Sequence, residues 1–245
     1  MNVVVARITL RQLLSRRRTL LLVLLGALLL LVAIIRRVSG ASEGADPSFT
    51  ADLLDNLGVR VVMPLVALLF GTGAMGAELE EGTAIYILAK PVSRISIAVT
   101  KFAVALVCTL LLGCLPILLA GFISGGEDVA GVAIGFTLGA GLGAAVYCTI
   151  FLALSLVTGR AFVFGLAYVL VWEGFLAGLL PGIRTLSVRE QTLAFAKAIG
   201  GIPDAVFSAD LALGTAVVAA ALIALAAMVI AVRRIRRIEI AGETA

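Results

Sequence analysis

Long apolar runs alternate with short polar stretches along the whole chain. A helix needs about 20 apolar residues to cross about 30 Å of hydrocarbon. By that criterion the pattern predicts six transmembrane helices, at about 19–35, 58–77, 96–124, 129–158, 161–180 and 211–232. Pro116 is expected to kink the third helix. We therefore expect an all-α integral membrane protein with a single transmembrane domain over residues 1–245.

Residues 1–18 differ from these runs because apolar and basic positions fall on opposite faces of a helix. Val3, Ala6 and Leu10 share one face, whereas Arg7 and Arg11 share the other. This spacing predicts an amphipathic helix at the inner headgroup layer. A cleavable signal peptide, cut near 39–41, is the alternative. The apolar run that follows is long for a signal peptide and five arginines precede it, so we expect an uncleaved first span.

Two connecting stretches carry a pattern of their own. Residues 78–94 run from acidic to basic with an apolar middle, and Gly82, Thr83 and Pro91 can break, cap and stop a short helix there. The pattern favours a short amphipathic helix beside the membrane as much as a solvated loop. Residues 181–210 show helical spacing and predict a hairpin of short helices partly inserted from outside, with an ordinary extracellular loop as the alternative.

Composition makes the bilayer the solvent of this chain. Hydrophobic residues make up 62%, charged residues 14%, and the mean hydropathy is +1.17, whereas soluble domains carry about 25% charged residues. The net charge of +4 comes from basic residues at helix ends and forms no nucleic-acid patch. With the N-terminus inside, thirteen of the nineteen lysines and arginines are cytoplasmic. The positive-inside rule therefore places both termini in the cytoplasm, and we expect a multi-pass protein of the plasma (inner) membrane.

Several kinds of chemistry lack their residues. The chain has no histidine, which removes histidine-based nucleophilic catalysis and histidine-ligated zinc. Cys108, Cys114 and Cys148 lie in apolar runs without C-x-x-C spacing, so we interpret them as buried small residues and expect no metal site. No G-x-x-x-x-G-K-[ST] motif occurs, so any ATP hydrolysis must come from another polypeptide.

Glu173 is the acidic residue deep in the predicted spans, in the outer half of the fifth. A carboxylate there is costly unless it is paired, neutralised or wetted, which makes it a candidate for the substrate path. A structural ion pair bracing the outer loop is the equal alternative. The candidate partners are basic residues near the outer face, namely Arg36, Arg37, Arg60 and Arg184.

Glycines recur every four residues in the fourth predicted span, at Gly131, Gly135, Gly139 and Gly143. A helix without side chains on one face lets a neighbouring helix approach closely, and such packing drives helix association in lipid. We expect this face to pack within the chain, with a sliding surface as the alternative.

The loop between the second and third predicted spans resembles one protein family. The runs Glu80-Glu81-Gly82-Thr83 and Pro91-Val92-Ser93-Arg94, followed by Lys101, are similar to the signature of type-2 ATP-binding-cassette (ABC) permeases. The six-span plan, the basic entry helix and the long outer loop also match, so the resemblance covers essentially the whole chain. It implies that residues 78–94 are a coupling helix that docks on an ATPase subunit. The residues implied to form or frame that contact are Glu80, Glu81, Gly82, Thr83, Pro91, Ser93 and Arg94.

The leading hypothesis is therefore a permease subunit of an ABC exporter. It implies two copies of this chain, or one with a close relative, on two cytoplasmic ATPase subunits that hold ATP and Mg²⁺. This chain itself would carry no cofactor and no catalytic residue. A stand-alone secondary transporter or channel with Glu173 as its ion or proton site is the alternative. A membrane enzyme is a third class, which the absence of histidine disfavours. Aliphatic spans with a single acid favour an amphipathic or lipid-like cargo only weakly.

Overall fold

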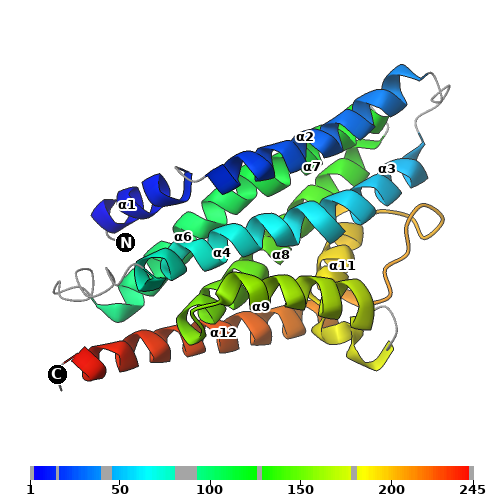
Figure 1. Ribbon diagram of the computed structural model, residues 1–245. Coiled ribbons are helices and arrows are strands. Elements are labelled where there is room, and N and C mark those ends of the chain that lie inside the picture. Colours follow the sequence, from blue (N-terminus) through cyan, green and yellow to red (C-terminus); the bar gives the residue numbers. More distant parts are fainter. Residues whose placement is uncertain are drawn as a thin grey trace.

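The computed structural model describes residues 3–14, 17–39, 46–80, 93–125, 129–177 and 181–242. Every regular element within these ranges is a helix, and the long helices run up and down one elongated bundle (Figure 1). The first half of the bundle contains α1 (Val3–Leu14), α2 (Arg17–Val38), α3 (Pro47–Leu53), η1 (Leu54–Val62), α4 (Met63–Glu80), α6 (Arg94–Thr109), η2 (Leu110–Cys114) and α7 (Leu115–Gly125). The second half contains α8 (Ala130–Val157), α9 (Ala161–Ala167), η4 (Tyr168–Leu176), η5 (Pro181–Leu186), α11 (Val188–Gly200) and α12 (Leu213–Gly242).

Five of these helices are long and apolar enough to cross a membrane. They cover Thr19–Val38, Pro47–Gly76, Arg94–Gly125, Ala130–Val157 and Leu213–Ile235. The fifth of the six expected spans corresponds to a shorter apolar helix, Ala161–Leu176, which joins α9 and η4. At 1.5 Å per residue its 7 and 9 residues reach about 24 Å, less than the hydrocarbon thickness. The described structure thus contains five full-length spans and one short apolar helix.

The second helix begins at Pro47, so the predicted start at Gly58 was wrong. Asp46 caps it, because its Oδ1 accepts hydrogen bonds from the amides of Ser48 (3.1 Å) and Phe49 (3.2 Å). Pro47 follows at the first helical position, where its missing N–H costs nothing. The added turns contain polar residues, and hydropathy therefore excluded them from the span.

The third helix is irregular beside Pro116. A π-helical stretch, η2, ends at Cys114 and α7 starts at Leu115, so the irregular turn directly precedes the proline. Pro116 has no N–H to donate to the carbonyl four residues earlier, which loosens the hydrogen bonding there. Its ring also lies against α2, since a Cβ on Gly26 would come 3.0 Å from Pro116 Cγ. The proline thus marks both a change of helical pitch and a close helix contact.

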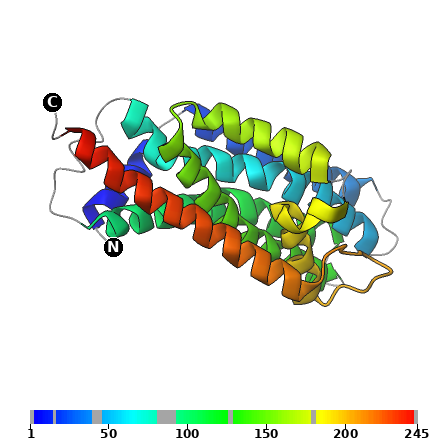
Figure 2. The same cartoon turned by 90° about the horizontal axis from the view of Figure 1, so that it is seen from below.

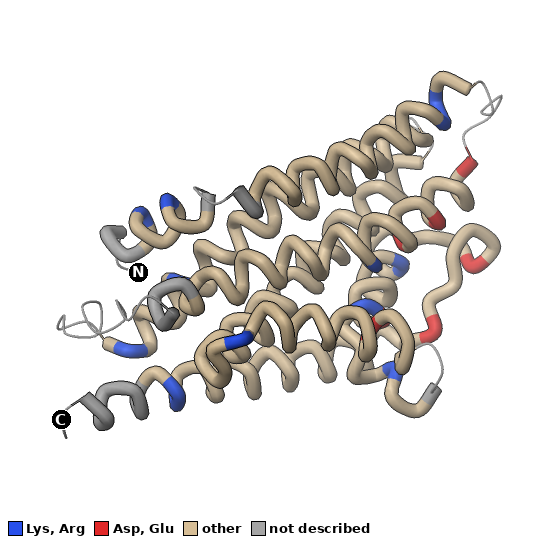
Figure 3. Tube along the Cα trace, viewed as in Figure 1, with Lys and Arg blue, Asp and Glu red and all other residues tan. Residues whose placement is uncertain are grey.

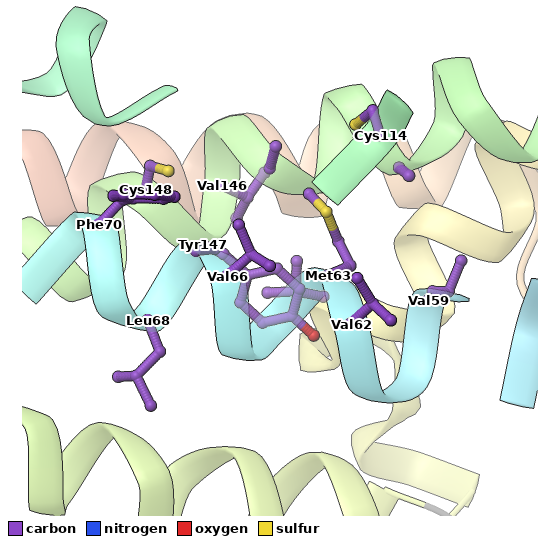
Figure 4. Packing of buried hydrophobic residues seen from close by; sticks show 14 of the residues in the cluster. Val59, Val62, Met63, Val66, Leu68, Phe70, Cys114, Val146, Tyr147 and Cys148 are labelled. Atoms are coloured by element: carbon purple, nitrogen blue, oxygen red, sulfur yellow. The ribbon is translucent and has the colours of Figure 1, made fainter. Parts of the chain in front are cut away.

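Helix α8 forms the centre of the bundle. It packs against α4, α7, α11 and α12. In its most apolar 18-residue stretch 67% is buried inside the protein, compared with 28% for the same length of α2 and 22% for α12. Figure 4 shows Tyr147 and Cys148 of α8 among Met63, Val66 and Phe70 of the neighbouring helix. The outer faces of α2 and α12 remain apolar and exposed, as expected for surfaces that face lipid.

The two ends of the bundle differ in structure and charge. The C-terminal part of α12, helix α1, the end of α4 and the start of α6 share one end, here called the terminal end (Figure 1). Helix α11 lies at the opposite end, the α11 end, beside the first turns of α12 (Figure 2). Every aspartate and glutamate drawn in red lies at the α11 end (Figure 3). The charged residues that Figure 3 colours at the terminal end are lysines and arginines.

Candidate functional site

Glu173 lies at the α11 end and binds the first residues of α11. Its side chain is buried, with the residue 6% exposed. The Tyr168 hydroxyl donates to its Oε1 at 2.9 Å and the Ser187 hydroxyl to its Oε2 at 2.5 Å. The backbone amides of Val188 and Arg189 donate at 2.9 and 3.4 Å. The carboxylate therefore accepts four hydrogen bonds from the described residues.

This arrangement follows from how α11 starts. Ser187 is the N-cap residue, and its hydroxyl oxygen accepts from the amide of Glu190 at 3.2 Å. The first amides of a helix have no partner inside the helix, and the positive end of the helix dipole favours a carboxylate. Glu173 satisfies two of these amides from another helix. A buried carboxylate and an exposed helix start would each be costly alone, and here they stabilise each other.

None of the four arginines named as candidate partners makes a described bond to Glu173, so an ion pair with one of them is not what the structure shows. Arg184 pairs with Asp210 at 2.5 Å, and Arg36 with Asp46 at 3.5 Å. Arg60 donates to the carbonyl of Gly174 at 3.4 Å. Sequence reasoning considered only side-chain charges, whereas the amides and the cap hydroxyl of α11 lie closer to the carboxylate.

Arg189 carries the second part of this site. Its Nη2 donates to both carboxylate oxygens of Asp55, at 2.7 and 2.8 Å, and its Nη1 to Glu190 Oε1 at 2.8 Å. The three side chains are 18%, 14% and 10% exposed, in the order Arg189, Asp55 and Glu190. Burial raises the pKa of Glu190, and the charge of Arg189 opposes that rise. The Arg189 guanidinium thus forms a fork that binds Asp55 on one side and Glu190 on the other. Because Asp55 belongs to η1, this fork joins the second long helix to α11.

Four buried side-chain atoms make no hydrogen bond to the described residues. They are the Tyr147 hydroxyl, Trp172 Nε1, Arg189 Nε and Gln191 Oε1. The Tyr147 side chain is fully buried in α8. In Figure 4 the hydroxyl oxygen of Tyr147 points away from Phe70. The site therefore holds hydrogen-bonding groups beyond those that its present contacts use.

The glycines of α8 pack against the same helix, α11. A Cβ on Gly135 would lie 2.5 Å from the Ala196 carbonyl oxygen, and a Cβ on Gly139 would lie 2.7 Å from the Ala196 amide nitrogen. Gly131 faces Gly200, and Gly143 faces Thr192. The facing residues Thr192, Ala196 and Gly200 also recur every four positions. Two rows of small residues thus bring the backbones of α8 and α11 into contact.

Among the residues of the expected coupling contact, the described ones, Glu80, Ser93 and Arg94, lie at the terminal end. Glu81, Gly82, Thr83 and Pro91 fall outside the described residues, and Glu80 is the last residue of α4. Ser93 caps α6, since its hydroxyl accepts from the Ser96 amide at 3.3 Å. Arg94 is the first residue of α6.

Lys101, which belongs to the same sequence signature, is fully buried near this end. Its ammonium donates to the Ala74 carbonyl at 2.7 Å. The contact joins α6 to α4, the two helices that flank residues 81–92. A buried ammonium is stable only where such acceptors replace water.

Sequence reasoning missed the fork between Asp55 and Arg189, because the two residues lie 134 positions apart. One local signal for the start of α11 was available in the sequence. Ser187 and Glu190 have the spacing of a capping box, S-x-x-E, which predicts a helix start at the residue after Ser187. No cluster of three or more histidine, cysteine or acidic residues suited to a metal occurs in the described parts of the chain.

Comparison with known proteins gives the family. A family model described as ABC-2 family transporter protein matches residues 12–180, well over half of the 245 residues. A search among curated proteins found no match to this chain. The match extends from α1 to the end of the short apolar helix and includes the segment between α4 and α6. The chain is a multi-pass membrane protein and belongs to the ABC-2 family of transporter membrane proteins.

Proposed function

We propose that this chain is the permease subunit of an ABC exporter, driven by ATP hydrolysis on a separate ATPase subunit. The family match carries the proposal, since ABC-2 membrane proteins in general work with an ABC ATPase and are not themselves catalytic. ATP and Mg²⁺ are bound by two copies of that partner. Two copies of the permease, or this chain and a close relative, form the translocation path between them.

The terminal end faces the cytoplasm in this proposal. The charged residues coloured at this end in Figure 3 are lysines and arginines, in agreement with the positive-inside rule. Both termini are then cytoplasmic in the plasma membrane, with α1 in the inner headgroup layer. Arg7, Arg11 and Ile8 of α1 are exposed, which suits an interfacial position. The α9–η4 helix is the short fifth of six spans, and α11 is part of a re-entrant outer hairpin over residues 181–210.

Residues 78–94 dock on the ATPase subunit in this proposal. The anchoring of both flanking helices supports it: Lys101 joins α6 to α4, and Ser93 caps α6 at its first turn. A segment held between two fixed helix ends transmits a push from the ATPase to the bundle as a rigid-body movement. The contact residues are those of the family signature, Glu80, Glu81, Gly82, Thr83, Pro91, Ser93 and Arg94.

The geometry of Glu173 disfavours the alternative of a stand-alone transporter. A transported cation or proton needs free carboxylate lone pairs, but this carboxylate already accepts four hydrogen bonds. Glu173 therefore braces α11 in our proposal. If Glu173→Gln abolished ion flux in vesicles without ATP, the secondary-transporter reading would replace ours.

Co-purification tests the proposed function directly. The tagged chain, extracted from its native membranes in mild detergent, is expected to retain an ATP-hydrolysing subunit. Glu81→Lys with Gly82→Pro should lower the retained ATPase activity about tenfold or more, as loss of an interface hot spot does. Asp52→Asn is the matched control, because Asp52 is an exposed acid at the α11 end. An absence of ATPase activity in the parent, or equal retention in the double variant, would refute the proposal.

A further inference from the structure

Two separate helices each direct one acidic residue to the start of α11, and each does so from a π-helical stretch. Asp55 lies in η1 and Glu173 lies in η4. Such stretches widen the helix by a residue per turn and are frequent at functional sites. Arg189 meets both acids, since its guanidinium binds Asp55 and its amide binds Glu173. The first turn of α11 is therefore tied to two irregular segments.

The two irregular segments are also tied to each other. Arg60 of η1 donates to the carbonyl of Gly174 in η4 at 3.4 Å. The other face of α11 packs on α8 through the rows of small residues described above. Helix α11 thus has a tight apolar contact with α8 on one side and a charged contact with η1 and η4 on the other.

We propose that Asp55, Arg189, Glu190 and Glu173 form an ion-pair latch that fastens α11 to the η1 and η4 helices and opens during transport. The inference rests on the proposed function and concerns the end of the bundle opposite the ATPase. The α8–α11 contact stays closed, because backbone atoms meet there and a packed seam of this kind moves as a unit. The charged contact is the place where α11 separates from η1 and η4.

The chemistry of the cluster suits a contact that breaks and forms again. Three carboxylates bind Arg189, two at its guanidinium (Asp55 and Glu190) and one at its backbone amide (Glu173), so the cluster carries excess negative charge when all are ionised. Arg184 and Asp210 also face Glu190 electrostatically, with opposite signs. Arg189 Nε is a spare buried donor that can bind a carboxylate released from its present partners. Two alternative sets of hydrogen bonds are what a two-state element requires.

Cysteine labelling measures whether the latch holds α11. Val188 is fully buried at the first turn of α11, so Val188→Cys reports separation there. The three native cysteines are replaced by alanine, and the permease with its ATPase is treated in membrane vesicles with a membrane-impermeant maleimide. The parent reporter should react slowly. Asp55→Asn and Arg189→Gln should each raise the labelling rate about tenfold, which corresponds to a coupling of about 1.4 kcal/mol.

Two further variants keep the test independent of misfolding. Asp55→Asn combined with Arg189→Gln removes both partners, so its labelling rate should not exceed that of the faster single variant. Asp52→Asn, an exposed acid one turn before Asp55, should leave the rate unchanged. Equal labelling in the parent and the single variants, or multiplicative effects in the double variant, would overturn the latch.

Nucleotide separates this inference from the proposed function. ATP should raise labelling of the parent reporter and change little in Arg189→Gln, where the latch is already open. ATPase retention is measured on the same preparations. A retained ATPase with ATP-insensitive labelling overturns the latch alone, whereas no ATPase on the parent overturns the permease assignment.

Discussion

Replacing Gly139 with alanine places a methyl group against the backbone of α11. The new Cβ would lie 2.7 Å from the Ala196 nitrogen, 2.8 Å from the Thr192 carbonyl oxygen and 2.9 Å from the Ala196 Cα. Ordinary contacts of a Cβ begin at 3.4 Å. The backbones of α8 and α11 must therefore move apart by about 0.7 Å, the difference between 3.4 Å and 2.7 Å. All three obstacles belong to the backbone of α11, and no side-chain rotation relieves them.

Overpacking of this kind costs about 1–3 kcal/mol. For a chain of this size each kcal/mol shifts the melting temperature by about 2–4 °C, so Gly139→Ala should melt about 2–12 °C below the parent. The loss of stability should appear first at the α11 end, because the charged contacts of α11 require its present position.

Gly141→Ala is the matched control on the same helix. Its Cβ meets only Leu110 Cδ2, at the ordinary distance of 3.5 Å, and alanine favours helix over glycine by about 1 kcal/mol. Thermal unfolding of both variants in one detergent, followed by size-exclusion chromatography of the soluble fraction, gives the comparison. Equal melting temperatures for Gly139→Ala and Gly141→Ala would refute the close packing of α8 on α11.

Three further predictions concern hydrogen bonds and charge. Glu173→Gln places an amide NH₂ among four donors and should destabilise the protein by about 1–3 kcal/mol in thermal unfolding, whereas Asp204→Asn at an exposed position should not. Burial raises the pKa of Glu190 in the folded chain, so its contribution to stability is lost as the pH rises through that raised pKa. The melting temperature of the parent relative to Glu190→Gln should therefore increase as the pH falls from neutral. A difference in melting temperature that does not change with pH would contradict the burial of Glu190. Ser93→Ala removes the cap of α6 and should cost about 1 kcal/mol, whereas Ser96→Ala, which keeps the amide that Ser93 binds, should cost less; equal losses would contradict the cap.

Hydropathy located the long helices because a run of about 20 apolar residues has few alternatives to a span. It misplaced the second helix at its start, where Asp46, Asp52 and Asp55 interrupt the apolar pattern. Asp55 is largely buried there and is bound by Arg189, a partner that lies far along the chain. Polar turns at the end of a span therefore depend on tertiary contacts that local patterns do not contain.

The candidate site was predictable in part for the same reason. The lone acid in the fifth apolar run identified Glu173, and the spacing of glycines identified the α8 face. Neither pattern named α11 as the common partner, since an amide donor carries no residue-type signal. The coupling segment, residues 78–94, came from a family resemblance, and the family model spans it.

The order of synthesis gives the carboxylate of Glu173 one more consequence. Ser187, its closest donor, follows it by 14 positions in the chain, which takes about 1–3 s at ribosomal rates. During that interval an ionised carboxylate in the lipid would cost about 3 kcal/mol on insertion scales. Insertion of the short α9–η4 helix alone as it leaves the translocon is therefore disfavoured. It is expected to wait there and enter the bilayer together with α11 and α12 as one unit.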